Sequence, residues 1–448
     1  MANPVLHIKD SYYFELPKVL YPVEHTKREQ FPPVWVKLDP DFQDWEFDRL
    51  YDKFKQFAYE RNYPLLPAKS EVKKAWHTWR DGDHANFAKP FSEFLEAKYR
   101  VGVSTASQAK AAEKPAAEKA TSEATSLVGD SAYAGFVKFR GDQESGGVWP
   151  KLCSEAGDVK EYIKTTTDWP QEKYKAYNKE LSGKVVIPQP FGTLRNFYEK
   201  ESGFCVSKFM IIELAVALVL CVVFSWLAGK AHHGHPPKGK LWNLLETFVV
   251  FIRDQIAEPA IGHHDSHAFT PLLCTIFFFV LGCNLSGMIP WLGSPTGTFG
   301  VTLGLALVTF LTVIVSGMMR FGFLGFFKNQ IPSMDLPLYI AVFIKPMILA
   351  IELLGLCIKH AVLAIRLLAN MVAGHLVILG VMGLAFGAQA ALSFSAPDVP
   401  SWQWPVVATI AVVGSTLFNL LELFVAFLQA YIFTFLSALF IGAAIHHH

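Results

Sequence analysis

Residues 338–387 read LYIAVFIKPMILAIELLGLCIKHAVLAIRLLANMVAGHLVILGVMGLAFG, and this stretch decides the fold of the C-terminal half. It holds 50 residues, mostly apolar, with Pro346 as its only proline and no obvious polar turn. A helix of that length measures about 75 Å, whereas the hydrocarbon core of a bilayer is about 30 Å thick and an ordinary tilt needs only about 26 residues. The stretch is therefore either two crossings or one steeply inclined helix. We favour the second, in a hairpin with the apolar stretch Pro405–Ile441.

Three further apolar stretches precede this one, at Phe209–Leu227, Thr270–Pro290 and Phe299–Met319. Each is long enough to cross a bilayer as a helix. Between the first two, Leu241–Glu258 has apolar residues at helical spacing and polar residues on the other face, which predicts a helix at the membrane surface. The sequence therefore predicts an all-α membrane protein with about five membrane helices, one amphipathic surface helix and a strongly inclined final hairpin.

Charged residues are distributed very unequally along the chain. The whole chain has 40 Lys and Arg against 39 Asp and Glu, which excludes a nucleic-acid binder driven by bulk charge. Only 10 and 9 of these lie in residues 208–448, which excludes a purely soluble enzyme. The six cysteines form no C-x-x-C pair, so they indicate neither a disulfide framework nor a zinc site.

Lysine and arginine in the short loops predict the orientation. Lys230, Lys238 and Lys240 follow the first span, and Arg320 and Lys328 follow the third, whereas the other two loops have none. This pattern predicts an N-terminus outside and a C-terminus in the cytoplasm. The start of the chain has no apolar leader segment, so we expect no cleaved signal peptide.

The N-terminal half is polar and rich in aromatic residues, and its composition does not reveal its function. We expect a mainly α fold, interrupted by a flexible linker rich in Ala, Ser, Lys and Glu. The predicted division is a polar region over 1–101, the linker over 102–131, a second polar segment over 132–203 and a membrane domain over 204–448.

Polar residues recur on the two long apolar stretches. Lys345, Glu352, Lys359 and Arg366 are spaced by seven, so they form one nearly straight helical stripe that Asn370 continues. Charges in a membrane helix must face protein or water. The alternating signs argue against a voltage sensor, and the guanidinium of Arg366 never deprotonates in practice.

The last stretch carries a matching stripe of Ser415, Asn419, Glu422 and Gln429. Glu422 can exchange a proton, and His375 on the preceding stretch titrates near neutral pH when unperturbed. The two stripes predict a hydrated ion path beside a fixed positive charge. The alternative is a structural ion pair between Arg366 and Glu422.

The run RLLANMVAGHL from Arg366 resembles the signature of subunit a of the rotary F-type ATP synthase membrane sector. The resemblance covers roughly residues 204–445. Supporting matches are the segments Glu246–Asp254, Asn284–Pro290, Pro295–Thr302 and Leu428–Phe433.

This resemblance implies a stator subunit beside a ring of c subunits, with the peripheral-stalk b subunits and the rest of the synthase as partners. Arg366 matches the arginine that separates two proton half-channels. Glu422 and His375 match a relay pair, and Asn370 and Gln429 match the polar neighbours of the arginine. We expect no cofactor, no metal site and no catalytic site in this chain. Because it has no G-x-x-x-x-G-K-[ST] phosphate loop, we expect no nucleotide site either.

Some features depart from the family. Ordinary members lack most of residues 1–200, and Tyr12–Pro17 resembles a bacterial leader, which makes residues 23–185 an insertion. Glu352 and Lys359 are supporting polar positions, and Lys359 has three alternatives: an ion pair with Glu352, snorkelling, or binding of lipid headgroups.

Two other classes compete with this interpretation: an independent channel or secondary transporter, which would favour inverted repeats, and a membrane anchor with static ion pairs. The expected location is the bacterial inner membrane, with the mitochondrial inner membrane as the alternative.

Overall fold

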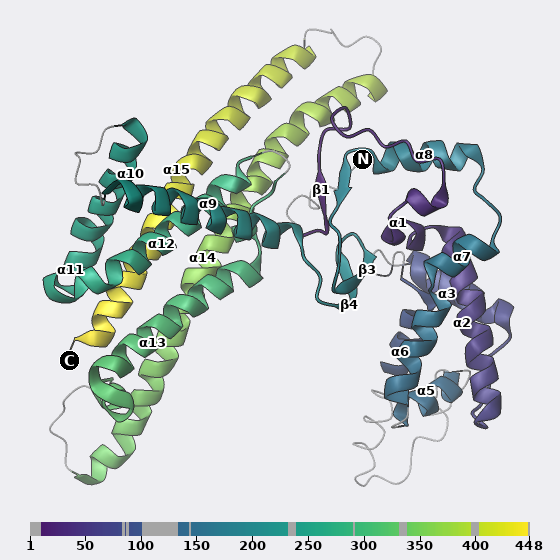
Figure 1. Ribbon diagram of the computed structural model, residues 1–448, viewed down its shortest axis with the longest axis horizontal. Helices are drawn as coiled ribbons and strands as arrows, with labels where there is room; N and C mark the ends of the chain where they lie inside the picture. The colour runs from purple at the N-terminus through teal and green to yellow at the C-terminus, as the bar shows by residue number, and fades with distance from the viewer. Residues whose placement is uncertain are drawn as a thin grey trace. The chain divides into compact units, whose positions relative to one another are not determined.

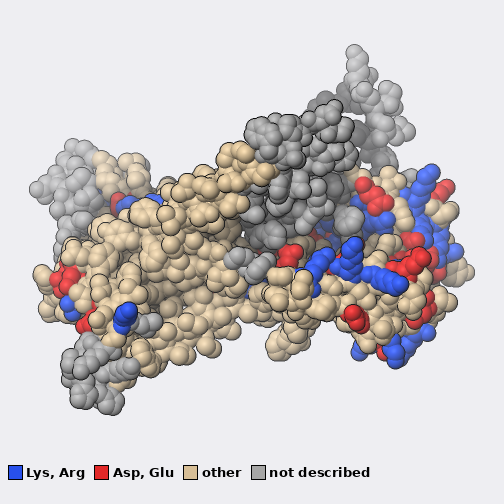
Figure 2. Space-filling view, turned by 90° about the horizontal axis from the view of Figure 1, so that it is seen from above, with Lys and Arg blue, Asp and Glu red and all other residues tan. Residues whose placement is uncertain are grey.

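The computed structural model describes residues 10–82, 86, 89–100, 133–142, 145–231, 239–289, 292–330, 338–395 and 403–446. The chain divides into two compact units. The membrane unit comprises Met1–Leu16 and Val206–His448, and the N-terminal unit comprises Pro17–Cys205. In the view of Figure 2, charged side chains gather on the N-terminal unit, while the membrane unit presents a broad uncharged surface. The predicted linker over 102–131 lies outside the described residues.

Five helices of the membrane unit are long and apolar enough to cross a membrane. This finding confirms the prediction of an all-α membrane protein. The five are α9 (Lys208–Ala231), α12 (His263–Gly287), α13 (Phe299–Asn329), α14 (Leu338–Ser395) and α15 (Gln403–Ile445) (Figure 1). The unit also contains the strand β1 (Tyr13–Glu15) and the 3₁₀ turn η6 (Pro295–Gly297).

The two longest helices are α14 and α15, which contain 58 and 43 residues. They measure about 87 Å and about 65 Å, and they run side by side (Figure 1). Each long apolar stretch is therefore one continuous helix rather than two crossings. A candidate span of 35 residues in α14 is about 52 Å long, so it fits a hydrocarbon core of about 30 Å only with a tilt steeper than usual.

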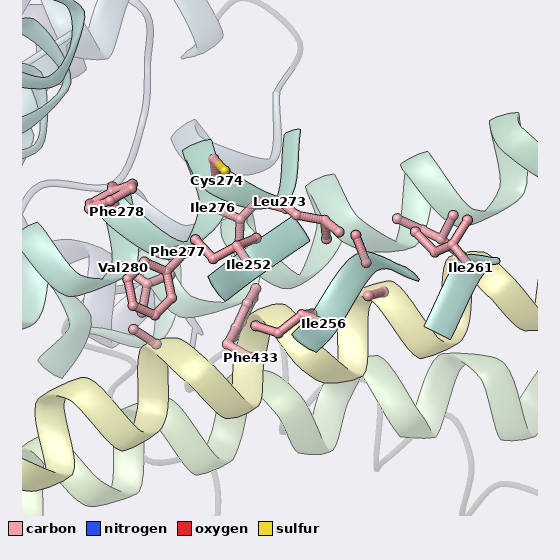
Figure 3. Close-up of a cluster of buried hydrophobic side chains, with 14 of the residues drawn as sticks. Ile252, Ile256, Ile261, Leu273, Cys274, Ile276, Phe277, Phe278, Val280 and Phe433 are labelled. Carbon is pink, nitrogen blue, oxygen red and sulfur yellow. The ribbon is translucent and has the colours of Figure 1, made fainter. Parts of the chain in front are cut away.

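The predicted surface helix is divided into three parts: α10 (Lys240–Phe251), the π-helical η5 (Ile252–Ala257) and α11 (Glu258–Ile261). The wider π turn changes the helical register. Ile252 and Ile256 are thereby completely buried in the core of the unit. Figure 3 shows them beside side chains of α12 and α15. This amphipathic segment thus also forms part of the core.

A very close backbone contact joins the end of α15 to α11. A Cβ atom on Gly442 would lie 2.0 Å from the carbonyl oxygen of Ala260. Only glycine fits there without displacing one of the two helices. The contact holds the C-terminal turns of α15 on the buried segment.

The N-terminal unit is mainly helical and has an aromatic core. Phe47 and Trp76 stack with ring centroids 5.4 Å apart, and Phe54 contacts the edge of Phe136. The helices are η2 (Arg28–Gln30), α1 (Pro33–Lys37), α2 (Pro40–Glu60), α3 (Lys69–Gly82), a helix over 91–100, α5 (Ala134–Gly141), α6 (Ser145–Ala156), α7 (Val159–Thr165) and α8 (Gln171–Leu181), and the strands are β2 (Lys184–Val186), β3 (Gly192–Asn196) and β4 (Glu199–Gly203).

Glu46 on α2 is the carboxyl group with the most altered titration in the N-terminal unit. Burial, opposed by the charge of Lys37, raises the pKa of Glu46 from 4.5 to about 7. Glu201 adds to the increase, and Arg195 opposes it. The folded unit therefore binds this proton more tightly than the unfolded chain does.

We expect Gly442→Ala to destabilise the membrane unit by about 1–3 kcal/mol, because the added methyl group must separate α15 from α11. The measurement is the thermal unfolding midpoint of the purified protein, which should fall by about 2–4 °C per kcal/mol. Gly380→Ala on α14 is the control, because a Cβ atom there would meet nothing within 4 Å. Equal midpoints for the two variants would show that the close contact is not a constraint.

We expect the contribution of Glu46 to stability to be complete below pH 4.5 and to be lost as the pH rises through about 7. The free energy of unfolding, measured with denaturant, should therefore decrease between pH 5.5 and pH 8 in the wild type. The decrease should be smaller in Glu46→Gln. Glu155→Gln is the control, because a hydrogen bond from Lys53 holds the pKa of Glu155 below its ordinary value. An unchanged pH dependence in Glu46→Gln would refute the assignment.

Candidate functional site

A pair of titratable side chains joins the two long helices. Nδ1 of His375 on α14 lies 2.7 Å from Oε1 of Glu422 on α15, and the side chains are 17% and 5% exposed. The neighbouring Gly374 admits the carboxyl group, since a Cβ atom there would lie 3.0 Å from the same oxygen. Either partner can hold the proton of this hydrogen bond. The structure therefore brings together two residues that the sequence placed 47 positions apart.

A buried hydrogen-bond network fixes α15 next to this pair. Nδ2 of Asn284 on α12 donates to the carbonyl oxygen of Ala426, 3.2 Å away and one helical turn after Glu422. The hydroxyl of Thr296 donates to Oδ1 of Asn284 over 2.8 Å, and Ser294 lies 2.8 Å from that hydroxyl. All of these side chains are buried. The network positions the stretch of α15 between Glu422 and Gln429.

Arg366 is half-buried and lies nine residues before His375 on α14, or about 13.5 Å along the helix axis. Within the part of the chain that the structure describes, no carboxylate lies within the 4.0 Å of an ion pair from its guanidinium. Glu422, the partner considered in the structural alternative, contacts His375 instead. The structure thus leaves a fixed cation of α14 without an anionic partner among the described residues.

The amide residues predicted beside the arginine lie in different environments. Asn370 is half-buried on α14, whereas Gln429 is only 6% exposed on α15. In the described ranges, neither side chain forms a hydrogen bond with Arg366. The structure therefore brings His375 and Glu422 together, but it does not bring Asn370 or Gln429 into contact with Arg366.

The supporting residues of α14 follow the stripe predicted from their spacing. Nζ of Lys359 lies 3.8 Å from Oε1 of Glu352, and both side chains are about half exposed. Of the three alternatives for Lys359, the structure forms the ion pair. Lys345, at the start of the stripe, is exposed.

The supporting residues of α15 do not all face inward. Ser415 is half-buried, and its hydroxyl has no hydrogen-bond partner among the residues described. Asn419 is exposed, whereas Glu422 and Gln429 are buried. Only the second half of the stripe is therefore covered by this chain itself.

Sequence reasoning missed several buried polar residues, and His360 is the titratable one among those on α14 and α15. His360 on α14 is 3% exposed and lies against the rings of Phe310 and Phe440. Its Nδ1 donates to the carbonyl oxygen of Leu356 over 2.9 Å. His360 follows Lys359 directly and therefore lies off the seven-residue stripe, so the spacing gave no signal for it.

Among the described residues, no group of three or more His, Cys, Asp or Glu could hold a metal ion. The sequence cluster of His232, His233 and His235 lies outside the described residues.

Comparisons with known proteins agree on one family. The family model described as ATP synthase A chain matches residues 209–442. A relative named ATP synthase subunit a, from Myxococcus xanthus, is 38% identical over 242 residues, which cover 53% of this chain and 73% of the relative. Relatives of the same name from Chloroherpeton thalassium and an Anaeromyxobacter species are 35% and 38% identical, over 62% and 53% of this chain and 78% and 54% of their own lengths.

We expect Gly374→Ala to slow ATP-driven proton transport by about 5- to 160-fold. The added methyl group would crowd Glu422, and a strain of about 1–3 kcal/mol in the barrier corresponds to that range. The measurement is acidification of inside-out vesicles. Gly380→Ala, six residues further along α14, is the matched control and should keep the wild-type rate. Normal transport by Gly374→Ala would show that proton transport does not depend on the His375–Glu422 contact.

Proposed function

The chain belongs to the ATP synthase A chain family, and we propose that it forms the two proton half-channels of the membrane sector against a rotating ring of c subunits. It is a multi-pass membrane subunit of the ATP synthase. The observation that carries the proposal is that the guanidinium of Arg366 has no anionic partner among the described residues and lies on the same helix as His375 of the buried His375–Glu422 pair, about 13.5 Å away along the axis.

The surface of α14 around Arg366 supports a protein partner with a negative charge. Ile358, Val362 and Ile365 are each about half exposed along this helix. An apolar face of this kind suits lipid or another apolar helix, but a charged guanidinium facing lipid costs at least about 2.5–3.5 kcal/mol. A carboxyl group on a neighbouring subunit would remove this cost whenever it is ionised. The ring of c subunits supplies such a group in our proposal.

The permanent charge of Arg366 determines which protonation state a ring carboxyl group has when it passes. A cation that never deprotonates stabilises an adjacent carboxylate only in its ionised form, and it repels a free proton. A ring carboxyl group must therefore release its proton on one side of Arg366 and pass the guanidinium as an anion. It then takes up a proton from the other side. Because Arg366 blocks direct flow between the two paths, proton movement and ring rotation are coupled.

His375 and Glu422 form the relay of one half-channel in this proposal. Their 2.7 Å contact lets a proton transfer between them without a large movement of either helix. Asn370 and Gln429 lie along the same two helices and supply polar groups near the path. Glu352, Lys359, Ser415 and Asn419 line its outer parts in the proposal.

The remaining partners and the location follow from the family. We propose contacts with the peripheral-stalk b subunits and a location in the bacterial inner membrane. The bacterial sources of the relatives described above support this location.

We expect Arg366→Ala to reduce ATP-driven acidification of inside-out vesicles to the background level. Arg366→Lys should recover little, because a lysine ammonium lacks the planar fork that holds two carboxylate oxygens and can lose its proton. Lys345→Ala is the matched control, since it removes an exposed cation of the same helix and should leave transport near the wild-type rate.

Co-purification of the c ring with each variant separates loss of transport from loss of assembly. Wild-type pumping by an assembled Arg366→Ala complex would exclude the proposed role and favour a static anchor.

A further inference from the structure

The exposed apolar residues of the N-terminal unit concentrate where the chain enters and leaves it. The chain crosses between the units at Leu16–Pro17 and at Cys205–Val206. Near these crossings the large exposed apolar side chains are Val19, Leu20, Tyr21, Phe191 and Phe204, with exposed fractions from 42% to 90%. Elsewhere in the described part of this unit, Tyr59 and Leu65 are the only large apolar side chains that are also exposed. Scattered exposed apolar residues are ordinary, but five of the seven in the described part of this unit lie beside the two crossings.

The local structure at each crossing holds these side chains outward. The amide of Leu20 donates to the carbonyl oxygen of Pro17 over 2.9 Å, which closes a tight turn with Val19 and Leu20 at its end. The second crossing follows the antiparallel hairpin of β3 and β4 (Figure 1).

At the base of this hairpin, the amide of Phe204 donates to the carbonyl oxygen of Phe191 over 3.2 Å. The paired residues next to them are Gly192 and Gly203. Gly203 has φ +75°, and a Cβ atom there would lie 2.3 Å from the oxygen of Phe191. The two phenylalanines therefore leave the hairpin from adjacent, fixed backbone positions.

The length of the chain keeps Phe204 close to the membrane, whatever the relative placement of the two units. Phe204 lies four residues before Lys208, where α9 and its candidate span begin. Four residues reach at most about 14 Å. Met210 and Leu214 are already exposed on α9, so the lipid-facing surface starts within its first two turns. The polar interface of a bilayer extends about 5–8 Å beyond the hydrocarbon on each side, which is within this reach.

The N-terminal segment is held at the same end of α9. The amide of Lys208 donates to the carbonyl oxygen of Ser11 over 2.8 Å, and the carboxylate of Asp10 accepts from the amide of Phe209 over 3.4 Å. The segment that leads to the first crossing therefore also starts at the beginning of the span.

We propose that Phe191, Phe204 and the turn Pro17–Leu20 form a lipid-contact surface that seats the N-terminal unit on the bilayer interface. The occupant is the lipid headgroup region, where the sides of aromatic and aliphatic residues lie against acyl chains. Continuity with the membrane-spanning helix α9 favours lipid over another protein. The proposal needs only the membrane location of the chain and does not depend on proton transport.

The test replaces single residues by the photoreactive amino acid p-benzoylphenylalanine in the full chain within its complex. The complex is reconstituted in vesicles of phosphatidylethanolamine and radiolabelled phosphatidylglycerol, and lipid attached to the chain is counted after illumination. Phe191, Phe204 and Leu20 are the test positions. Tyr59, an aromatic residue that is 80% exposed away from both crossings, is the matched control. Co-purification of the other subunits shows that each variant is folded.

We expect at least about tenfold more lipid on the chain at Phe191 and Phe204 than at Tyr59, and an increase at Leu20 as well. Labelling at the level of Tyr59 would overturn the proposal. Cross-linking of Phe191 and Phe204 to another protein chain would also overturn it, because the surface would then be a subunit interface.

Discussion

The cost of placing polar groups in hydrocarbon controls the packing of the membrane unit. An ionised side chain at the centre of a bilayer costs at least about 2.5–3.5 kcal/mol, and an unpaired buried polar group is costly as well. Helices α14 and α15 carry such groups over lengths of about 87 Å and about 65 Å, far more than one perpendicular crossing needs. The buried polar groups of these helices therefore need partners within the apolar core. Glu422 forms a hydrogen bond with His375, and Asn284 donates one to the backbone of α15.

The same constraint distinguishes Arg366 from the other charged residues of the stripe. Glu352 and Lys359 compensate each other, and Glu422 has a hydrogen-bond partner in His375. Arg366 has no anionic partner among the described residues, so its cost is left for another molecule to offset. In a stator subunit, this is the condition that lets an ionised carboxyl group on a moving ring bind and leave again.

Sequence reasoning predicted the features that depend on length and periodicity. The spans and the preference for two long continuous helices follow from counting residues, whereas the ion pair of Glu352 with Lys359 is one of three alternatives that the sequence leaves open. It did not predict which residues meet across helices, because the contact of Asn284 with Ala426 depends on how α12 packs on α15. Asn419 is exposed in the chain taken alone, which the sequence could not show because periodicity defines a face of the helix but not what covers it. The sequence also did not predict the aromatic core of the N-terminal unit, because its packing joins residues that are far apart in the sequence, such as Phe54 and Phe136.

Exchanging His375 and Glu422 tests most directly whether their contact takes part in proton transport. His375→Glu and Glu422→His each place two like groups in contact, whereas the double variant restores one carboxyl group and one imidazole in reversed order. ATP-driven proton transport should be strongly reduced in each single variant and largely recovered in the double variant, with the c ring bound in all three. A double variant no more active than the single variants would show that the contact of α14 with α15 is only structural.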